Sequence, residues 1–553
     1  MCGIIGGNGF KDLSKVKQGL QTMMHRGTDG NTIFTFDNQM CISHNRLSIQ
    51  DLSEMANQPM ISDDSRFYLA FNGELWKPSF EKFDKKLRKL YNFKTEKSDS
   101  ELLLYYLIHY LDVLPSALRE LEGMFCFALY DSETDTTYLG RDFIGRLPLY
   151  YIHENGKFGF SSEAKGLVVG MDEPFYKIDV KSKRYKLSEY KDKEKIKSVP
   201  PGTLIKFSPH PFVNEEYEME EHLWFDWKPP YDKEEKTYYP RNDKEFQDYD
   251  TQNGNKGLKY YTQGFRERLI KAVDDETISD VPICTILSGG IDSTIITYIL
   301  TKELGLNVEA FVVNVNRLRN TKVKDDLYYA RMAAKEFGIK LHEVNVDRVD
   351  IERALEESIW ASETHKWTQI SPAVAQLFLS WEIRDKGYKV VFGGEGADEI
   401  FASYGDVKRF CWPNPIWYHQ KRVNLLKGLH KSNLIRTNKS MMYGGKVELR
   451  TPFLNKEVID FGLRIPTKYR DENNGKGNHM KYILREAFKN DISEELLWRP
   501  KKTFQVGCHT DYLKNEQDKI DDMFANIFIE GNYEKYINRF FGHTEARIKI
   551  EPQ

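Results

Sequence analysis

The chain has 553 residues, with 80 Lys and Arg against 83 Asp and Glu, so its formal charge at pH 7 is −3. A chain this close to neutrality has no positive field that would attract nucleic acid or an anionic membrane. No apolar run approaches the roughly 18 residues that a membrane span needs, and the first residues lack the basic and apolar regions of a secretory signal. The six cysteines include no C-x-x-C pair, which argues against a disulfide scaffold or a structural zinc site. We therefore expect a cytoplasmic enzyme of several domains.

The first 208 residues have the pattern of many short strands and few helices. Apolar segments such as 67–75 and 123–131 end at turn-forming residues, as strands do. Apolar residues recur at helical spacing in two places, Leu13–Met24 and Ser100–Leu111. This pattern predicts a layered α+β domain over residues 1–208.

Residues 209–257 differ in composition from the segments on either side. They are charged, contain Pro and have few aliphatic residues. We interpret them as a linker or insert with one short strand, HLWFDW, at 222–227. Lys181–Lys197 is a smaller insert of the same kind.

In the second half, strands and helices alternate. Apolar strands are predicted at 281–287, 308–315, 340–346 and 389–394, and helices at 264–277, 293–304, 326–338, 350–362 and 372–386. This βαβ order predicts an α/β domain over residues 258–553, with a parallel sheet covered by helices on both faces. Ligands of such sheets bind at the carboxyl ends of the strands.

Cys2 follows the initiator Met directly. Removal of Met1 would leave a thiol and a free α-amine on one residue, and the amine could act as the base for the thiol. The alternative is an ordinary small residue at the start of a buried strand.

Three loops after Cys2 carry groups that an amino-acid substrate needs. Arg46 could bind a carboxylate, Asp99 an ammonium group, and the Asn72 side chain with the Gly73 amide a tetrahedral oxyanion. Each also has a simpler explanation, since Asn-Gly is a common hairpin turn and Ser98-Asp99 could cap the following helix.

Together, in this order after MCGI, the segments HRGTDG, HNRLSI, FNGEL and SDSE resemble the glutamine amidotransferase domain of the N-terminal-nucleophile hydrolases. GMFCFALYD, GRDFIGRLPLYY and FSSEAKGL extend the resemblance over the N-terminal half. It implies that Cys2 attacks the side-chain amide of glutamine, releasing ammonia and leaving a glutamyl thioester. It also implies a glutamine site made of Arg46, Ile49, Asn72, Gly73, Glu74 and Asp99.

SGGIDS, at 288–293, lies between an apolar strand and a helix. Its glycines let the backbone turn around an anion, while hydroxyl groups and the first amides of the helix donate hydrogen bonds. No Gly-Lys-Ser/Thr follows, so it is not a Walker A loop. It resembles the pyrophosphate loop of enzymes that adenylate a substrate, and the resemblance implies ATP contacts by Leu287, Ser288, Gly289, Gly290, Asp292, Ser293, Val313, Gly393 and Gly394.

GGEGADE, at 393–399, follows the next predicted apolar strand. Asp398 and Asp292 make a plausible pair of oxygen ligands for Mg²⁺, and Glu395 is a candidate proton acceptor when ammonia attacks an acyl-adenylate. A glycine-rich turn with solvated acids is the alternative. Lys481 is assigned to the transferred phosphates by resemblance, since a lone Lys on a helix is usually solvated.

From residue 2 to about 507 the chain resembles glutamine-hydrolysing asparagine synthetases. The resemblance implies an N-terminal layered αββα domain and an ATP-pyrophosphatase-type domain with a parallel sheet. It implies the conversion of aspartate, glutamine and ATP into asparagine, glutamate, AMP and pyrophosphate, with ATP and Mg²⁺ required and ammonia passing through an internal tunnel. A homodimer is possible.

The departures from this family concentrate on the acceptor side. The family segment E-T-x-x-x-T-T-x-R-A-S is ETHKWTQISPA here, with Gln369 and Ser371 in place of Thr and Arg. Asn455 stands where Asp is usual, Gly393 where Ser is usual and Thr28 where Pro is common. The lost Arg leaves open whether aspartate or another carboxylate is amidated. A plain glutaminase and a binding protein on an inactive scaffold also stay open, whereas Cys2 argues against the β-lactam-forming relatives.

Overall fold

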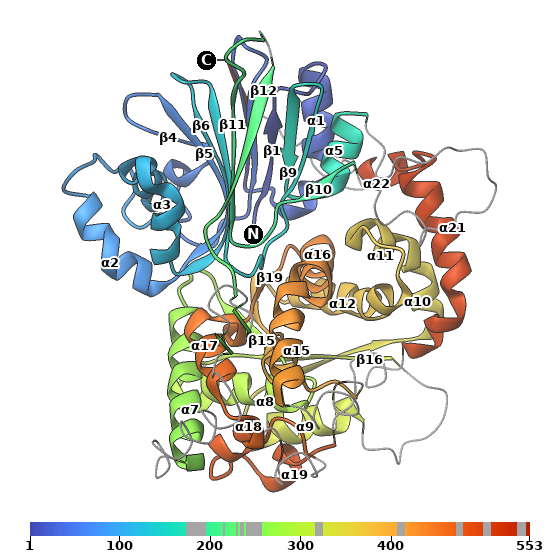
Figure 1. Cartoon of the computed structure of the whole chain (residues 1–553). Coiled ribbons are helices and arrows are strands. Elements are labelled where there is room, and N and C mark those ends of the chain that lie inside the picture. Colours follow the sequence, from blue (N-terminus) through green and yellow to red (C-terminus); the bar gives the residue numbers. More distant parts are fainter. Residues whose placement is uncertain are drawn as a thin grey trace.

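A computed structural model describes residues 1–172, 195–213, 216–227, 231–232, 237–238, 257–315, 325–405, 407, 415–469, 471, 479–500, 510–538 and 549–552. Its N-terminal part contains two stacked sheets, with strand orders β10-β8-β9-β1-β3-β2-β20 and β12-β11-β7-β6-β5-β4. Figure 1 shows this part above a second part built around a five-stranded sheet. Most of the predicted insert at Lys181–Lys197 lies outside the described residues.

The first sheet holds β1 (Gly3–Gly7), β2 (Gly30–Thr35), β3 (Cys41–Arg46), β8 (Tyr150–Glu154), β9 (Lys157–Ser161), β10 (Lys197–Ser198) and β20 (Lys549–Pro552). Helices α1 (Leu13–Gln21) and α5 (Ala164–Gly170) cover its outer face (Figure 1). The apolar face of α1 comes from Val16 and Leu20, which are buried at helical spacing.

The second sheet holds β4 (Met60–Ile61), β5 (Phe67–Leu75), β6 (Gly123–Asp131), β7 (Thr136–Arg141), β11 (Thr203–Pro209) and β12 (Tyr217–Leu223). Helices α2 (Lys77–Leu87) and α3 (Asp99–His109) lie against it. Alternate residues of β6 face the two sides: Met124 and Cys126 pack between the sheets, and Phe125 and Phe127 pack under the helices. The layers are therefore α, β, β and α, which confirms the predicted N-terminal fold class.

The strand predicted at 222–227 is wrong in its position. The structure places β12 at Tyr217–Leu223, paired antiparallel with β11. Trp224 and Trp227 are instead buried beyond the strand end, so the aromatic run that indicated a strand reflects side-chain burial in a loop. The second sheet thus continues past residue 208, and the domain boundary there stays a prediction.

The C-terminal part has a parallel sheet in the order β17-β16-β15-β18-β19. Its strands are β15 (Ile283–Ile286), β16 (Ala310–Val315), β17 (Leu341–Val346), β18 (Val390–Phe392) and β19 (Glu448–Arg450). On β16, Ala310 and Val312 face one core, and Phe311 and Val313 face the other. A strand buried on both faces is typical of a sheet with helices on each side, so the predicted α/β class is confirmed.

The helices of this part lie in chain order around the sheet. They are α7 (Gly257–Asp275), α8 (Ile291–Tyr298), α9 (Asp326–Phe337), α10 (Arg348–Arg353), α11 (Leu355–Ser362), α12 (Trp367–Asp385), α13 (Ala397–Ile400), α15 (Pro415–Gly428), α16 (Asn433–Gly445), α17 (Lys456–Arg464), α18 (Tyr482–Ala487), α19 (Glu494–Leu497), α21 (Gln517–Phe528) and α22 (Glu534–Asn538). Helix α12 begins five residues before Pro372, the predicted start, because Pro tolerates the first turns of a helix better than its middle.

No helix among the described residues is both long and apolar enough to cross a membrane.

Candidate active sites

Cys2 is buried between the two N-terminal sheets, just before β1. Its backbone N–H donates to Oδ1 of Asn72 at 2.8 Å, and the N–H of Leu47 lies 3.4 Å from its sulfur. Burial raises the pKa of the Cys2 thiol above its ordinary value, which the charge of the chain's N-terminus partly offsets. The thiol therefore needs a base, and an α-amine freed by removal of Met1 would already lie against Asn72.

Asn72 and Gly73 lie on β5, where close approach of β6 requires the glycine. A Cβ on Gly73 would lie 2.2 Å from the Met124 carbonyl oxygen and 2.8 Å from Cα of Phe125. The Asn72 side chain reaches Cys2 on one side and the Cys126 sulfur, at 3.5 Å, on the other. The Asn-Gly pair is thus part of a long strand and not of a hairpin turn.

The charged residues of the predicted glutamine site gather around Cys2. Arg46 and Glu74 are close enough to act on the thiol electrostatically, and Asp99 acts on Arg46 in the same way. Burial raises the pKa of Asp99 to about 7 and also raises that of Glu74, and buried Glu448 adds to both shifts. Such a cluster favours a cation beside it, as the ammonium group of an amino acid would be.

Arg46 and Ile49 are partly occupied by the protein itself. The Arg46 guanidinium donates to the carbonyl of Ser53 at 2.7 Å and to Oδ1 of Asn57 at 2.9 Å. The Ile49 carbonyl accepts from the N–H of Asp280 at 2.9 Å, across the boundary between the two parts. Arg46 therefore holds the loop beside the site, and its contact with a substrate carboxylate stays a prediction.

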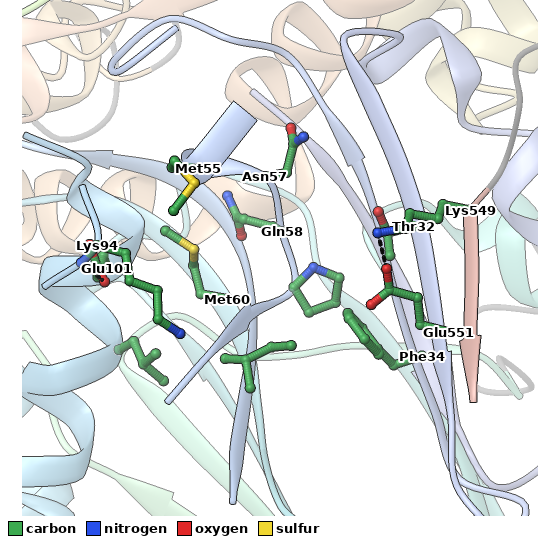
Figure 2. Close-up of a pocket in the computed structure, with 13 residues that line it drawn as sticks. Thr32, Phe34, Met55, Asn57, Gln58, Met60, Lys94, Glu101, Lys549 and Glu551 are labelled. Carbon is green, nitrogen blue, oxygen red and sulfur yellow. Dashed lines mark hydrogen bonds and ion pairs between the residues drawn. The ribbon is translucent and has the colours of Figure 1, made fainter. Parts of the chain in front are cut away.

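A pocket of about 210 Å³ lies beside this site and not at Cys2 (Figure 2). Asn57, the partner of Arg46, forms part of its wall, and Lys549 and Glu551 of β20 lie on the opposite side. The other lining residues are Thr32, Phe34, Met55, Gln58, Pro59, Met60, Ile61, Lys94, Glu101 and Leu104. The C-terminal strand thus closes the edge of the sheet next to the loop that holds Arg46.

The loop after β15 has the geometry that an anion site needs. Gly289 has φ +67°, and a Cβ there would lie 2.5 Å from that of Tyr329. The Ser288 and Ser293 hydroxyls lie 3.1 Å apart, and Gly290 forms the N-cap of α8. Leu287 donates to the carbonyl of Phe311 on β16, at 2.9 Å; Val313 lies two residues further towards the carboxyl end of that strand.

The two glycine-rich loops touch each other. A Cβ on Gly394 would lie 2.7 Å from that of Asp292. Lys481 forms ion pairs with both Asp292 and Asp398, the latter at 2.7 Å. Lys481 is almost fully buried and adopts a left-handed conformation, with φ +61°. The three residues are therefore brought together as predicted, and Lys481 is not solvated.

Glu395 lies in the second loop with its carboxylate folded back over Gly393. A Cβ on Gly393 would come within 2.3 Å of Oε2 of Glu395. Burial raises the pKa of Glu395, and the nearby guanidinium of Arg436 partly opposes this. The raised pKa suits a proton acceptor, and the departure from the family's Ser makes room for this conformation.

The acceptor-side departures have structural explanations. Ser371 is fully buried and donates to Thr510, 2.9 Å from its carbonyl and 2.8 Å from its hydroxyl. Gln369 lies on the first turn of α12. Asn455 caps α17 by accepting from the N–H of Glu457 at 2.9 Å, as Asp would. Thr28 accepts from Lys446 at 2.9 Å.

The sequence analysis missed a set of buried ion pairs at the boundary between the two parts. Arg146 pairs with Glu276 at 2.8 Å, and Glu448 pairs with Arg450 at 2.9 Å and with the amino group of Met1 at 3.1 Å. Charged letters inside the apolar runs KVELR and GRDFIGRL were the available signal. Their partners lie over a hundred residues away and could not be assigned.

Comparisons with known proteins cover both parts. Residues 1–218 match the glutamine amidotransferase domain family, and residues 264–423 and 412–539 match the asparagine synthase family. The chain is 31% identical to asparagine synthetase B [glutamine-hydrolyzing] of Escherichia coli (strain K12), over 92% of this chain and 82% of that protein.

It is also 30% identical to a probable asparagine synthetase [glutamine-hydrolyzing] of Schizosaccharomyces pombe, over 91% and 84%. Among solved structures, glutamine phosphoribosylpyrophosphate amidotransferase from B. subtilis matches with 14% identity, covering 62% of this chain and 81% of that one with a TM-score of 0.32. The identity and coverage of the sequence relatives establish that the chain belongs to the family of glutamine-hydrolysing asparagine synthetases.

Proposed function

We propose that this protein makes asparagine from aspartate, using ATP and the amide nitrogen of glutamine. The observation that carries the proposal is the pairing of two sites in one chain. A buried N-terminal thiol has groups for an amino acid around it, and a Lys–Asp–Asp cluster lies at the carboxyl ends of a parallel sheet. Family membership makes glutamine hydrolysis and asparagine synthesis the corresponding reactions.

At the first site, Cys2 attacks the glutamine amide and releases ammonia. Asn72 holds the α-amine that takes the proton of the thiol, and its amide group, with the Gly73 N–H, donates to the oxyanion. Asp99 and Glu74 bind the substrate ammonium group, whose positive charge lowers their raised pKa values. Water then cleaves the thioester to glutamate.

At the second site, the aspartate side-chain carboxylate attacks the α-phosphorus of ATP, and pyrophosphate leaves. Ser288, Ser293 and the N-terminus of α8 donate to the phosphates, and Lys481 offsets the charge that develops on them. Ammonia then attacks the acyl-adenylate, Glu395 accepts its proton, and AMP leaves. Arg436 is a buried cation near Glu395 and a candidate partner for the acceptor's other carboxylate.

The residues present fit a Mg²⁺ ion bound together with ATP. Asp292 and Asp398 already share one cation, the Lys481 ammonium group, so their geometry suits a positive charge between them. Two carboxylates are a sparse ligand set, as Mg²⁺ bound mainly through substrate phosphates needs. The ion would neutralise phosphate charge when ATP is bound.

A continuous series of buried contacts supports an enclosed route for ammonia between the sites. The Met1 amino group, next to Cys2, contacts Glu448 of β19, and Arg450 at the end of β19 accepts through its carbonyl from Gly393 at 2.9 Å. Gly393 adjoins Glu395. Ammonia in bulk water at pH 7 would be mostly protonated and unable to attack.

The proposal is tested by incubating the protein with ATP, Mg²⁺ and glutamine, with and without aspartate, and measuring pyrophosphate and asparagine together. Equal formation of both, dependent on aspartate, is expected. Glutamate release without aspartate-dependent pyrophosphate would contradict aspartate as the acceptor. Cytoplasmic location and a homodimer stay predictions, which cell fractionation and sedimentation would check.

A further inference from the structure

A chain of buried charged side chains crosses the boundary between the two parts. We call it the interface network and define it as Arg26, Glu163, Lys165, Glu363 and Lys439. Every member is at most 7% exposed. Three of them belong to the N-terminal part, while Glu363 and Lys439 belong to the C-terminal part. None of them has a role in the chemistry proposed above.

One end of the interface network holds the nucleophile. Nε of Arg26 donates to the carbonyl of Cys2 at 2.7 Å, and Nη1 donates to Oε1 of Glu163 at 2.6 Å. Glu163 also forms an ion pair with Lys165 and lies 3.0 Å from the His25 ring. These cations hold the pKa of Glu163 well below its usual range, so it stays charged.

The other end holds the turn that precedes the acceptor-side segment. The Glu363 carboxylate accepts from the backbone N–H of Lys165 at 2.7 Å and from that of Ala164 at 3.2 Å. Glu363 also pairs with Lys439 of α16, which donates to the Tyr150 hydroxyl at 2.8 Å. Both carboxylate oxygens of a C-terminal-part residue are thus bound by the N-terminal part.

Glu363 is at a hinge-like position in the backbone. It forms the C-cap of α11 with φ +53°, a conformation that a non-glycine residue adopts only when its surroundings hold it. The next residues, 364–373, carry the acceptor-side departures and the start of α12. A shift of this turn when the acceptor binds would therefore displace Glu363 relative to α5.

Such a displacement has only one direction in which to travel. Buried charges cannot exchange their partners for water, so they move together or lose stability. The contacts from Glu363 lead through Lys165, Glu163 and Arg26 to the Cys2 carbonyl without passing through solvent-exposed groups. We propose that Glu363 is a positioning residue that couples occupancy of the acceptor site to the alignment of Cys2, an inference that rests on the proposed function.

The test compares Glu363→Gln with the unaltered protein in three assays. They are ammonia-dependent asparagine synthesis, basal glutaminase activity, and stimulation of the glutaminase by ATP with aspartate. Glutamine keeps the size and one acceptor oxygen but removes the charge that binds Lys439. We expect stimulation to fall about tenfold, within the range of typical coupling between sites, and the ratio of glutamate to asparagine to rise. Ammonia-dependent synthesis at saturating aspartate should stay close to that of the unaltered protein.

Two further variants separate coupling from stability. Glu363→Gln combined with Lys439→Met leaves no unpaired charge at this contact, so thermal stability should recover while stimulation stays low. Glu356→Gln on the same helix removes an exposed partner of Lys535, at 2.5 Å, and should behave as the unaltered protein does.

Three results would overturn the inference: normal stimulation in Glu363→Gln, parallel loss of all three activities with melting temperature, or recovery of stimulation in the double variant. If the unaltered protein makes no asparagine from ammonia, aspartate and ATP, the proposed function itself fails. Ammonia-dependent synthesis with normal coupling in Glu363→Gln would refute the positioning role alone.

Discussion

Replacing Gly73 by Ala should damage the glutaminase site while leaving the synthetase site intact. The added Cβ would lie 2.2 Å from the carbonyl oxygen of Met124, and both close neighbours are backbone atoms of the paired strand β6. Normal contact needs about 3.2 Å, so β5 and β6 must separate by about 1 Å beside Asn72. A displacement of that size at a catalytic group costs about 100-fold in rate.

The assay for Gly73→Ala is glutamine-dependent against ammonia-dependent asparagine synthesis, measured on the same preparation. We expect kcat/KM for glutamine to fall about 100-fold and the ammonia-dependent rate to stay unchanged. Gly428→Ala is the matched control, since a Cβ there meets nothing within 4 Å. A Gly73→Ala protein that hydrolyses glutamine normally would refute the reasoning that strand spacing positions Asn72.

Three further predictions concern the charged groups and the second glycine loop. Because the pKa of Asp99 is about 7, the carboxyl is neutral below that pH and binds an ammonium group poorly, so kcat/KM for glutamine should rise with pH through about 7; the rise should vanish in Asp99→Asn, and an unchanged profile would count against Asp99. Lys481→Met should abolish synthesis but let Mn²⁺ bind Asp292 and Asp398 without ATP, as measured by electron paramagnetic resonance; equal Mn²⁺ binding in both proteins would contradict it. Gly393→Ser should push the Glu395 carboxylate away and lower the amidation rate severalfold without changing glutaminase activity, and an unaltered amidation rate would show that Glu395 tolerates the side chain.

The sequence was sufficient for the repeating elements and for residues in contiguous motifs. Helix α3 and strand β5 were predicted within a residue or two because their apolar spacing and turn residues agree. SGGIDS and GGEGADE were placed at strand ends by the same local signals, and the structure brings Asp292 and Asp398 together around Lys481. Lys481 itself had no local signal, since its burial comes from a tertiary contact.

The features that were missed depend on distant partners. Glu363 and Lys165 are separated by 198 residues in the chain, and Met1 and Glu448 by 447. A charged letter in a sequence gives no indication of whether it will be buried, because burial requires the opposite charge to arrive from elsewhere. The strand at 222–227 failed for a related reason, since aromatic residues indicate burial more reliably than they indicate β-structure.

The pairing of β20 with β2 has a consequence for synthesis of the protein. Residues 549–552 are hydrogen-bonded in parallel to residues 32–35, so the N-terminal sheet receives its edge strand from nearly the last residues of the chain. On the ribosome, this sheet therefore stays incomplete until translation has passed the whole C-terminal part. A glutaminase fragment expressed alone would expose the free edge of β2, and such edges favour intermolecular strand pairing and aggregation.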